Sequence, residues 1–257
     1  MKATLTVLGS GTSVGVPTIG CDCGVCNSAD PKDRRTRPSI LVEYAGKSVL
    51  IDTTPDFREQ AIRERIRRLD AVLYTHPHAD HLLGIDDLRP LSYQHKPGKL
   101  RLYARKDAVE FIRNMFGYIF SPAYKFGGLP QLELVEISGP LELFGAKFEP
   151  VTVVHGEIEI LGFRFGSAAY LTDHSGIPDN SMAQLQNLDI LFLDALRHQP
   201  HPTHSTVENS LRIVELLKPK RAFFTHICHD LPHEATNASL PDKVRLSYDG
   251  MKLSFEI

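Results

Sequence analysis

The 257-residue sequence lacks any apolar run that approaches the ~20 residues a membrane-spanning helix requires. It also carries little net charge, because 29 Lys and Arg residues stand against 31 Asp and Glu residues. A surface that is one continuous footprint for nucleic acid or membrane is therefore excluded, although a local basic patch is not. Cysteines number only four, and the first residues alternate like a strand, without the apolar core of a signal peptide. We therefore expect a cytoplasmic protein whose cysteines form a metal or redox site and not disulfides.

Low-complexity linkers are missing as well, and the composition, with 42% apolar residues, is that of a globular chain. Strand-like and helix-like segments mix through the whole length, which is close to the upper limit for one hydrophobic core. We therefore expect one α/β domain over residues 1–257, built from two sheets packed together with helices outside.

Periodicity and turn residues predict most of the individual elements. Ser39–Tyr44 and Lys47–Ile51 flank Ala45–Gly46 and predict a hairpin. Apolar residues at helical spacing predict a helix over Pro55–Arg68. Further strands are expected at Thr4–Leu8, Asp70–Thr75, Lys147–Val154, Ile160–Phe165, Ala168–Thr172, Asp189–Asp194 and Arg221–Thr225. Further helices are expected at Lys106–Tyr118, Pro178–Asn187 and Ser205–Leu217, and an exposed excursion at Phe120–Pro130.

The twelve histidines are clustered, and the densest cluster follows the predicted strand Asp70–Thr75. It contains His76, His78, Asp80 and His81, four potential metal ligands in six residues. These side chains cannot all surround one ion from a regular strand, but a turn after the strand can direct them to two neighbouring ions. Neutral imidazole together with carboxylate suits zinc, iron or manganese.

This HxHxDH pattern resembles the signature of the metallo-β-lactamase superfamily, whose members fold as an αββα sandwich around a dinuclear metal site. Three later positions also match that family: His155 in VTVVHGE, Asp173 in AAYLTDHSG and His226 in AFFTHIC. The resemblance implies two divalent ions, Zn or Mn, that share Asp173 as a bridging ligand. It further implies that one ion is held by His76, His78 and His155 and the other by Asp80, His81 and His226.

Asp52, in VLIDTTPDF, matches an acidic position of the same superfamily. There it would accept an N–H from a ligand histidine and fix that ring's tautomer. An aspartate in this context equally suits a helix cap or a turn, so the sequence leaves both roles open.

A second group of potential ligands lies on the loop over residues 20–27, where Cys21, Cys23 and Cys26 fall within six residues. Three thiolates so close together favour zinc with one ligand missing, and either Cys228 or His229 can supply it; three free buried thiols are the alternative. The arrangement resembles one branch of the superfamily, the phosphoribosyl cyclic phosphate phosphodiesterases of the PhnP family. That resemblance implies a structural zinc completed by His229.

The segment that begins at His204 suggests how a leaving group is protonated. Ser205 and Glu208 fit an S-x-x-E capping box, which would place His204 beside a helix N-terminus, where free N–H groups favour an anion. A histidine there can protonate an alkoxide. In the resembled phosphodiesterases a histidine of this segment is the general acid, and His204 matches best, with His198 and His201 as rivals.

A run of basic residues, Arg34, Arg35 and Arg37, follows the cysteine loop. The resembled family has an arginine run at the same place. These side chains would contact a terminal phosphate or a nucleotide backbone, or else form an ordinary solvated basic loop.

Taken together, the motifs predict a dinuclear metal-dependent hydrolase, specifically a phosphodiesterase that acts on a small cyclic or diester phosphate similar to 5-phosphoribosyl 1,2-cyclic phosphate. A hydroxide between the metals would attack phosphorus, and His204 and Asp80 are the residues we expect to take part in catalysis. The expected partner is a small phosphate ester and not a nucleic acid or a membrane, and a homodimer is left open.

Two alternatives remain. One is a tRNA 3′-end-processing endoribonuclease, because HST before a helix also resembles a motif of those enzymes; against it, the chain has no basic Gly/Pro-rich arm, and the cysteine loop is foreign to that family. The other is a PqqB-like metal-binding protein of cofactor biosynthesis, which has a similar cysteine loop. The intact seven-ligand set favours catalysis, although the fold alone does not decide the reaction.

Overall fold

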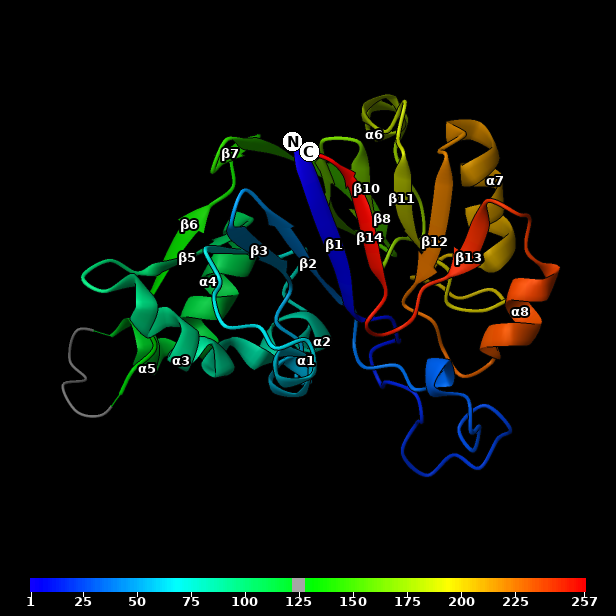
Figure 1. Cartoon of the computed structure of the whole chain (residues 1–257), viewed down its shortest axis with the longest axis horizontal. Coiled ribbons are helices and arrows are strands. Elements are labelled where there is room, and N and C mark those ends of the chain that lie inside the picture. Colours follow the sequence, from blue (N-terminus) through cyan, green and yellow to red (C-terminus); the bar gives the residue numbers. More distant parts are fainter. Residues whose placement is uncertain (122–127) are drawn as a thin grey trace.

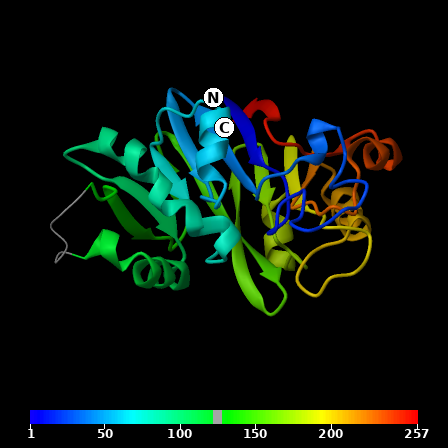
Figure 2. The same ribbon diagram turned by 90° about the horizontal axis from the view of Figure 1, so that it is seen from below.

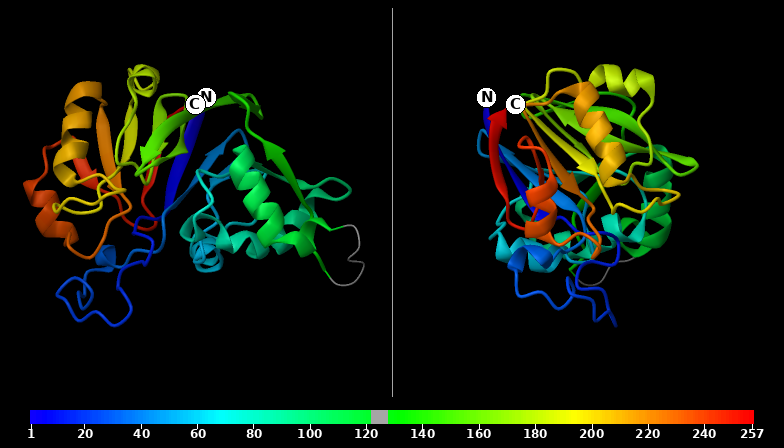
Figure 3. Two further views of the ribbon diagram at one scale, coloured as in Figure 1. Left: turned by 180° about the vertical axis from the view of Figure 1, so that it is seen from behind. Right: turned by 90° about the vertical axis from the view of Figure 1, so that its right-hand side faces the viewer.

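The computed structural model describes residues 1–121 and 128–257 (Figure 1). Within these residues two mixed sheets of seven strands each pack face to face, and helices cover their outer faces (Figure 3). The predicted two-sheet α/β sandwich is confirmed. The predicted excursion at Phe120–Pro130 falls largely on residues outside the described ranges.

The first sheet combines the N-terminal half of the chain with its last strand. Its order is β14 (Lys252–Glu256), β1 (Lys2–Gly9), β2 (Ser39–Tyr44), β3 (Lys47–Ile51), β4 (Ala71–Leu73), β5 (Leu100–Ala104) and β6 (Leu132–Glu136). The strands from β14 to β3 pair antiparallel, whereas β3 to β6 pair parallel. The hairpin of β2 and β3 has the predicted bounds, and its turn residues Ala45 and Gly46 both take positive φ.

The second sheet is formed by the remaining strands. Its order is β13 (Val244–Leu246), β12 (Arg221–Thr225), β11 (Ile190–Asp194), β10 (Ala168–Leu171), β9 (Ile158–Phe165), β8 (Ala146–His155) and β7 (Leu141–Leu143). Strands β10 to β13 run parallel, and β7 to β10 pair antiparallel. The carboxyl ends of the parallel strands of each sheet therefore meet at one edge, where ligands of α/β sheets commonly bind.

The two sheets divide the apolar interior into three layers. The helices are α1 (Phe57–Arg63), α2 (Ala79–Leu82), α3 (Arg89–Ser92), α4 (Lys106–Met115), α5 (Gly117–Phe120), α6 (Asp179–Gln184), α7 (Val207–Leu217) and α8 (His233–Ser239). The middle layer lies between the sheets and includes Phe148, Phe163 and Phe192. The outer layers lie under α1 to α5 on one side and under α6 to α8 on the other. No helix in the described ranges is both long and apolar enough to cross a membrane.

Several predicted bounds are corrected by turn geometry. The helix expected over Pro55–Arg68 ends at Arg63, because Arg65 takes a φ of 56° and the Ile66 N–H returns to the Ala61 carbonyl at 2.8 Å. This is a Schellman-type ending. The helix expected over Lys106–Tyr118 divides into α4 and α5. Strands β5, β6, β7, β13 and β14 were not predicted, and neither were helices α2, α3 and α8.

The two sheets are joined directly near the edge where the parallel strands end. The Leu161 N–H on β9 donates to the carbonyl of Thr75, which follows β4, at 3.1 Å. Gly11 after β1 forms an isolated bridge with Ile227 after β12. In Figures 1 and 2 the blue loop after β1 accordingly lies beside the orange segment after β12. This edge is therefore a meeting point for distant parts of the sequence.

Candidate active site

The HxHxDH segment lies where β4 ends. His76 and His78 are on the connection after the strand, and Asp80 and His81 are on the short helix α2, which His78 caps. The second sheet supplies the other three predicted ligands at the same edge. They are His155, the last residue of β8, Asp173, which follows β10, and His226, which follows β12. The structure thus brings all seven predicted residues into one group, called here the active-site cluster.

Three histidines form one half of the cluster. Ring nitrogens of His76, His78 and His155 lie within 4.8 Å of one another, and His76 Nε2 is 3.0 Å from His78 Nδ1. His155 Nδ1 donates to the carbonyl of Thr203 at 2.8 Å, which leaves its Nε2 facing the group. Gly156 makes this contact possible, because a Cβ there would lie 2.8 Å from Thr203 Cγ2.

Asp80, His81, Asp173 and His226 form the other half, again with ligand atoms within 4.8 Å of one another. One oxygen of Asp173 is 3.2 Å from His81 Nε2. The other is 3.2 Å from His226 Nε2 and 3.9 Å from His76 Nε2. The Asp173 carboxylate therefore lies between the two halves, which is the position a bridging ligand needs.

Several atoms of the cluster are buried without a hydrogen-bond partner among residues 1–121 and 128–257. They are Asp80 Oδ2, His81 Nε2 and His226 Nε2, and the three converge. Buried polar atoms without partners are rare and call for an unseen water or ion. Imidazole nitrogens and carboxylate oxygens are also the donors that first-row divalent metals prefer. The residues present therefore fit a pair of divalent cations.

Asp52 orients one of these side chains. Its Oδ2 accepts from His81 Nδ1 at 2.8 Å and from Thr75 Oγ1 at 2.8 Å, and its Oδ1 accepts the Thr75 N–H at 2.9 Å. The His81 tautomer is thereby fixed with Nε2 toward the cluster. The histidine contact that the sequence left open is thus observed, and the helix-cap alternative is wrong, since the N-cap of α1 is Asp56 and not Asp52.

The pKa values within the cluster differ according to what surrounds each ring. Burial lowers the pKa of His76 well below its usual value, so this imidazole is neutral, as a metal ligand must be. Burial acts in the same direction on His226, but the Asp173 and Asp80 carboxylates outweigh it and raise the His226 pKa to about 9. Desolvation alone would raise the pKa of Asp80, but the neighbouring His81 and His226 hold it well below its usual value. The ionised carboxylates make this a site for cations.

Backbone strain accompanies the site. Asp52, Asp173 and His226 have φ values of 67°, 56° and 58°, in the left-handed region that non-glycine residues rarely adopt. Each follows the end of a strand that enters the cluster. Strained residues persist only where the surroundings determine them, and they concentrate at functional sites.

His204 lies at the edge of the cluster. One of its ring nitrogens is within 4.8 Å of ligand atoms of His155 and Asp173, and its ring stacks on His226 with centroids 4.5 Å apart. Its Nδ1 donates to Asp194 Oδ2 at 2.7 Å. Sequence reasoning missed Asp194, although a lone acid at the end of the apolar run ILFLD was a signal that could have found it.

The capping box predicted from Ser205 and Glu208 is wrong. The N-cap of α7 is Thr206, whose Oγ1 accepts the Asn209 N–H at 3.1 Å. Ser205 is buried, and its hydroxyl is paired with that of Ser210 at 2.8 Å. The N–H groups assigned to a substrate anion are thus partly engaged by the protein.

The two rival histidines lie farther out. His198 Nδ1 is 2.6 Å from Glu208 Oε1, and His201 Nδ1 is 3.2 Å from Thr203 Oγ1. Both line a pocket of about 500 Å³ that His204 borders as well. Neither belongs to a group of metal-type ligands within the described ranges.

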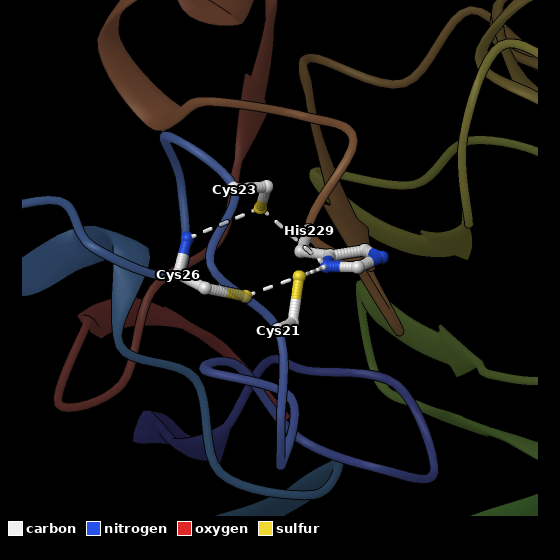
Figure 4. A group of neighbouring side chains, drawn as sticks. All are labelled: Cys21, Cys23, Cys26 and His229. Carbon is white, nitrogen blue, oxygen red and sulfur yellow. Dashed lines mark hydrogen bonds between the residues drawn. The ribbon is translucent and has the colours of Figure 1, made fainter.

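The cysteine loop forms the second group, called here the cysteine cluster. The Sγ atoms of Cys21, Cys23 and Cys26 lie 3.2, 3.6 and 3.3 Å from His229 Nδ1 (Figure 4). A hydrogen bond from the Cys26 N–H lowers the pKa of Cys23 to about 7, whereas burial raises that of Cys26 to about 11. Cys228 lies outside the cluster, so His229 completes the set of four.

The arginines after the cysteine loop have three different environments. Arg35 is 2% exposed and donates to Asp33 Oδ1 at 2.9 Å and to the carbonyls of Cys228 and Leu231 at 2.8 and 2.6 Å. It therefore ties the cysteine loop to the segment after His226, and both a phosphate contact and a solvated position are wrong for it. Arg37 is paired with Asp56, and only Arg34 is exposed.

Residues 47–227 match the family model described as the β-lactamase superfamily domain. The crystal structure of a diphosphatase from the PhnP family is 60% identical, has a TM-score of 0.94, and covers 99% of this chain and 98% of that one. An octanoyltransferase of Porphyromonas gingivalis is 38% identical over 251 residues, 96% of this chain and 50% of that protein. A ribonuclease Z of Bradyrhizobium diazoefficiens is 28% identical over 166 residues, 59% of this chain and 53% of that protein. The chain thus spans about half the length of these two relatives.

Proposed function

The chain belongs to the PhnP family of the β-lactamase superfamily, and on that premise we propose that it is a metal-dependent phosphodiesterase. The observation that carries the proposal is the Asp173 carboxylate between two groups of metal-type ligands, with His204 beside them. The proposed substrate is a small cyclic or diester phosphate of the 5-phosphoribosyl 1,2-cyclic phosphate type. The PhnP-family relative is a diphosphatase, which supports chemistry at phosphorus.

His76, His78 and His155 would hold one divalent ion, and Asp80, His81 and His226 the other, with Asp173 shared. When bound, the pair would supply a hydroxide nucleophile at neutral pH and polarise a phosphoryl oxygen. Zinc and manganese both suit these donors. Asp52 holds His81 in the tautomer that such binding needs.

His204 is the proposed general acid. Its Nδ1–H is held by the buried Asp194 carboxylate, so Nε2 is the nitrogen that faces the reacting group. As the bond between phosphorus and the leaving oxygen breaks, Nε2 would give its proton to that oxygen. Asp194 stabilises the protonated ring before transfer and keeps it in position.

For the cysteine cluster we propose a structural zinc held by Cys21, Cys23, Cys26 and His229. Four ligands and no open position are the usual arrangement of such sites. The ion would fasten the N-terminal loop to the segment that carries His226, where Arg35 already bridges the same two segments.

An RNA 3′-end endonuclease is the second candidate, and the likeness to ribonuclease Z favours it. Arg35 gives it no support, because that guanidinium is buried and fully engaged with protein acceptors. The two candidates differ in substrate size, so a direct assay separates them.

The test is turnover by purified, metal-loaded protein on cyclic phosphates, bis-p-nitrophenyl phosphate, a dinucleoside diphosphate, thioesters and precursor tRNA. We expect hydrolysis of small phosphoesters and about three transition-metal ions per chain, one of them resistant to mild chelation. Asp173→Ala is the control for contaminating activity. A protein that binds two ions at the active-site cluster but hydrolyses only precursor tRNA, or only thioesters, would refute the proposal.

A further inference from the structure

The pocket of about 500 Å³ beside the active-site cluster has no role in the proposed chemistry so far. It lies between the loop that carries His198 and His201 and the first turns of α7. His204 and Ser175 border it on the side of the metal-type ligands. Its charged and amide side chains are Glu208, Asn209 and Arg212.

His204 is the wall that this pocket shares with the cluster. One ring nitrogen lies within 4.8 Å of ligand atoms of His155 and Asp173, and the same ring lines the pocket. A general acid must lie against the leaving oxygen. The atoms that continue from that oxygen would then extend past the His204 ring toward the pocket that the same ring lines.

We propose that this pocket binds the leaving group of the substrate and that it takes a polar leaving group of nucleoside size. The inference rests on the proposed function, because only a phosphoester cleaved at the cluster has a leaving group there. It also gives His198 and His201 a role in leaving-group specificity and not in proton transfer.

The volume sets the size of the group. Pockets that bury a small ligand measure about 300–1,000 Å³, so this one is far larger than a methoxy group needs. A sugar joined to a flat base fits this range. The imidazoles of His198 and His201 supply flat faces for a base to stack on, and Pro200 and Pro202 add apolar surface beside them.

The lining sets the polarity. Glu208 Oε1 is 2.6 Å from His198 Nδ1, and Arg212 Nη1 donates to Asn209 Oδ1 at 3.1 Å. These pairs leave further carboxylate and guanidinium positions for the hydroxyl and ring-nitrogen groups of a nucleoside. An acyl chain in the same place would desolvate Glu208 and Arg212 without replacing their hydrogen bonds, which disfavours a lipid leaving group.

The first test compares adenosine release from diadenosine monophosphate with methanol release from the methyl ester of adenosine monophosphate, each product being measured directly. We expect the wild type to prefer the adenosine leaving group in kcat/KM. Glu208→Gln and Arg212→Met should each lower kcat/KM about tenfold on the dinucleoside substrate, mainly through KM, and leave the methyl ester within about twofold. Arg113→Met, at an exposed arginine of helix α4, is the matched control. Equal losses on both substrates, or none on either, would overturn the pocket assignment.

The second test does not depend on turnover. Adenosine binding to the wild type and to both pocket variants is measured by ligand-observed NMR, with binding expected for the wild type and Arg113→Met and about tenfold weaker binding for the variants. Adenosine binding without hydrolysis of any phosphoester would refute the phosphodiesterase and, with it, the leaving-group role, and would leave the pocket as an adenosine-binding site alone. Hydrolysis without adenosine binding would keep the phosphodiesterase and refute the pocket.

Discussion

The two groups of metal-type ligands are held in different ways. In the active-site cluster His81 and His226 are fully buried, and their positions follow from strands of two packed sheets. The cysteine cluster lies on loops, and Cys21, Cys23 and His229 are partly exposed. Only Cys26 is buried there, at 5% exposure.

The groups that orient the ligands differ as well. Histidines of the active-site cluster are oriented by hydrogen bonds from the ring nitrogen that faces away from the cluster. His81 Nδ1 donates to Asp52, and His155 Nδ1 donates to the Thr203 carbonyl. The thiols of the cysteine cluster receive N–H groups of their own loop, from Thr18 to Cys26 at 3.3 Å and from Cys26 to Cys23 at 3.4 Å. The fold therefore prepares the first site before metal arrives, whereas a metal at the second would itself hold the loop. Metal loss should remove activity in one case and order in the other.

The largest effect is expected at the bridging position. Asp173→Ala should abolish measurable phosphodiesterase turnover and weaken both catalytic ions, because its carboxylate reaches both halves of the cluster. Circular dichroism should remain native, since the surrounding sheets supply the fold. Asp80→Ala and His76→Ala should also abolish turnover without unfolding the chain, but each should weaken mainly the one ion that its own half of the cluster would hold. Wild-type turnover in any of the three variants would remove that residue from the site.

His204→Ala should lose about 10²- to 10⁴-fold in turnover on an alkyl phosphodiester, the usual range for general acid catalysis. A p-nitrophenyl diester needs no proton on its leaving group, so the loss there should be much smaller. Metal content, measured by elemental analysis, should stay at the wild-type level. Equal losses on both substrates would assign proton transfer to another group.

Asp52→Asn tests whether metal binding at the active-site cluster depends on the carboxylate that orients His81. Removing the carboxylate that accepts from His81 Nδ1 should weaken metal binding by about 10- to 100-fold, the usual effect of losing such a partner. Titration with a competing chelator measures it. An unchanged affinity would show that the strands alone align His81.

Cys21→Ser should have the smallest effect on activity and the clearest on stability. The chelation-resistant ion should be lost and Tm should fall by about 5–10 °C, while the catalytic pair still loads. Cys228→Ser is the matched control, because this buried thiol is outside the cysteine cluster. If Cys21→Ser keeps its zinc content and melts like the wild type, the structural-zinc proposal fails.

The grouping of the seven active-site residues was predicted from the resemblance to the metallo-β-lactamase superfamily, because each residue matches a position of that family at the end of a predicted strand. Asp194 was not found, because an acid at the end of an apolar strand marks an unusual position but does not show that it faces His204, ten positions later. The N-cap of α7 was predicted one residue early, because Ser205 and Thr206 both suit that role. The Ser205 hydroxyl is instead engaged by Ser210, a buried contact that the sequence does not reveal, and Thr206 caps the helix.

Arg35 shows a second limit of sequence reasoning. Its partners include the carbonyls of Cys228 and Leu231, almost two hundred positions away. A run of arginines ordinarily indicates a solvent-exposed loop, so nothing in the sequence indicates that this side chain is buried. Short strands such as β7 and β13, of three residues each, were missed because their pairing and not their periodicity defines them. Contacts between distant segments thus account for most of what the sequence did not reveal.

The division of the active-site cluster between two sheets has a consequence for folding kinetics. The first sheet supplies His76 and His81, and the second supplies His155, Asp173 and His226, so neither sheet alone carries a complete set for either ion. Metal capture then has to follow docking of the sheets, a late event that depends on contacts distant in sequence. Bound ions that must leave before the sheets separate would slow unfolding more than they speed refolding. The rate of metal uptake during refolding therefore reports the rate at which the two sheets dock.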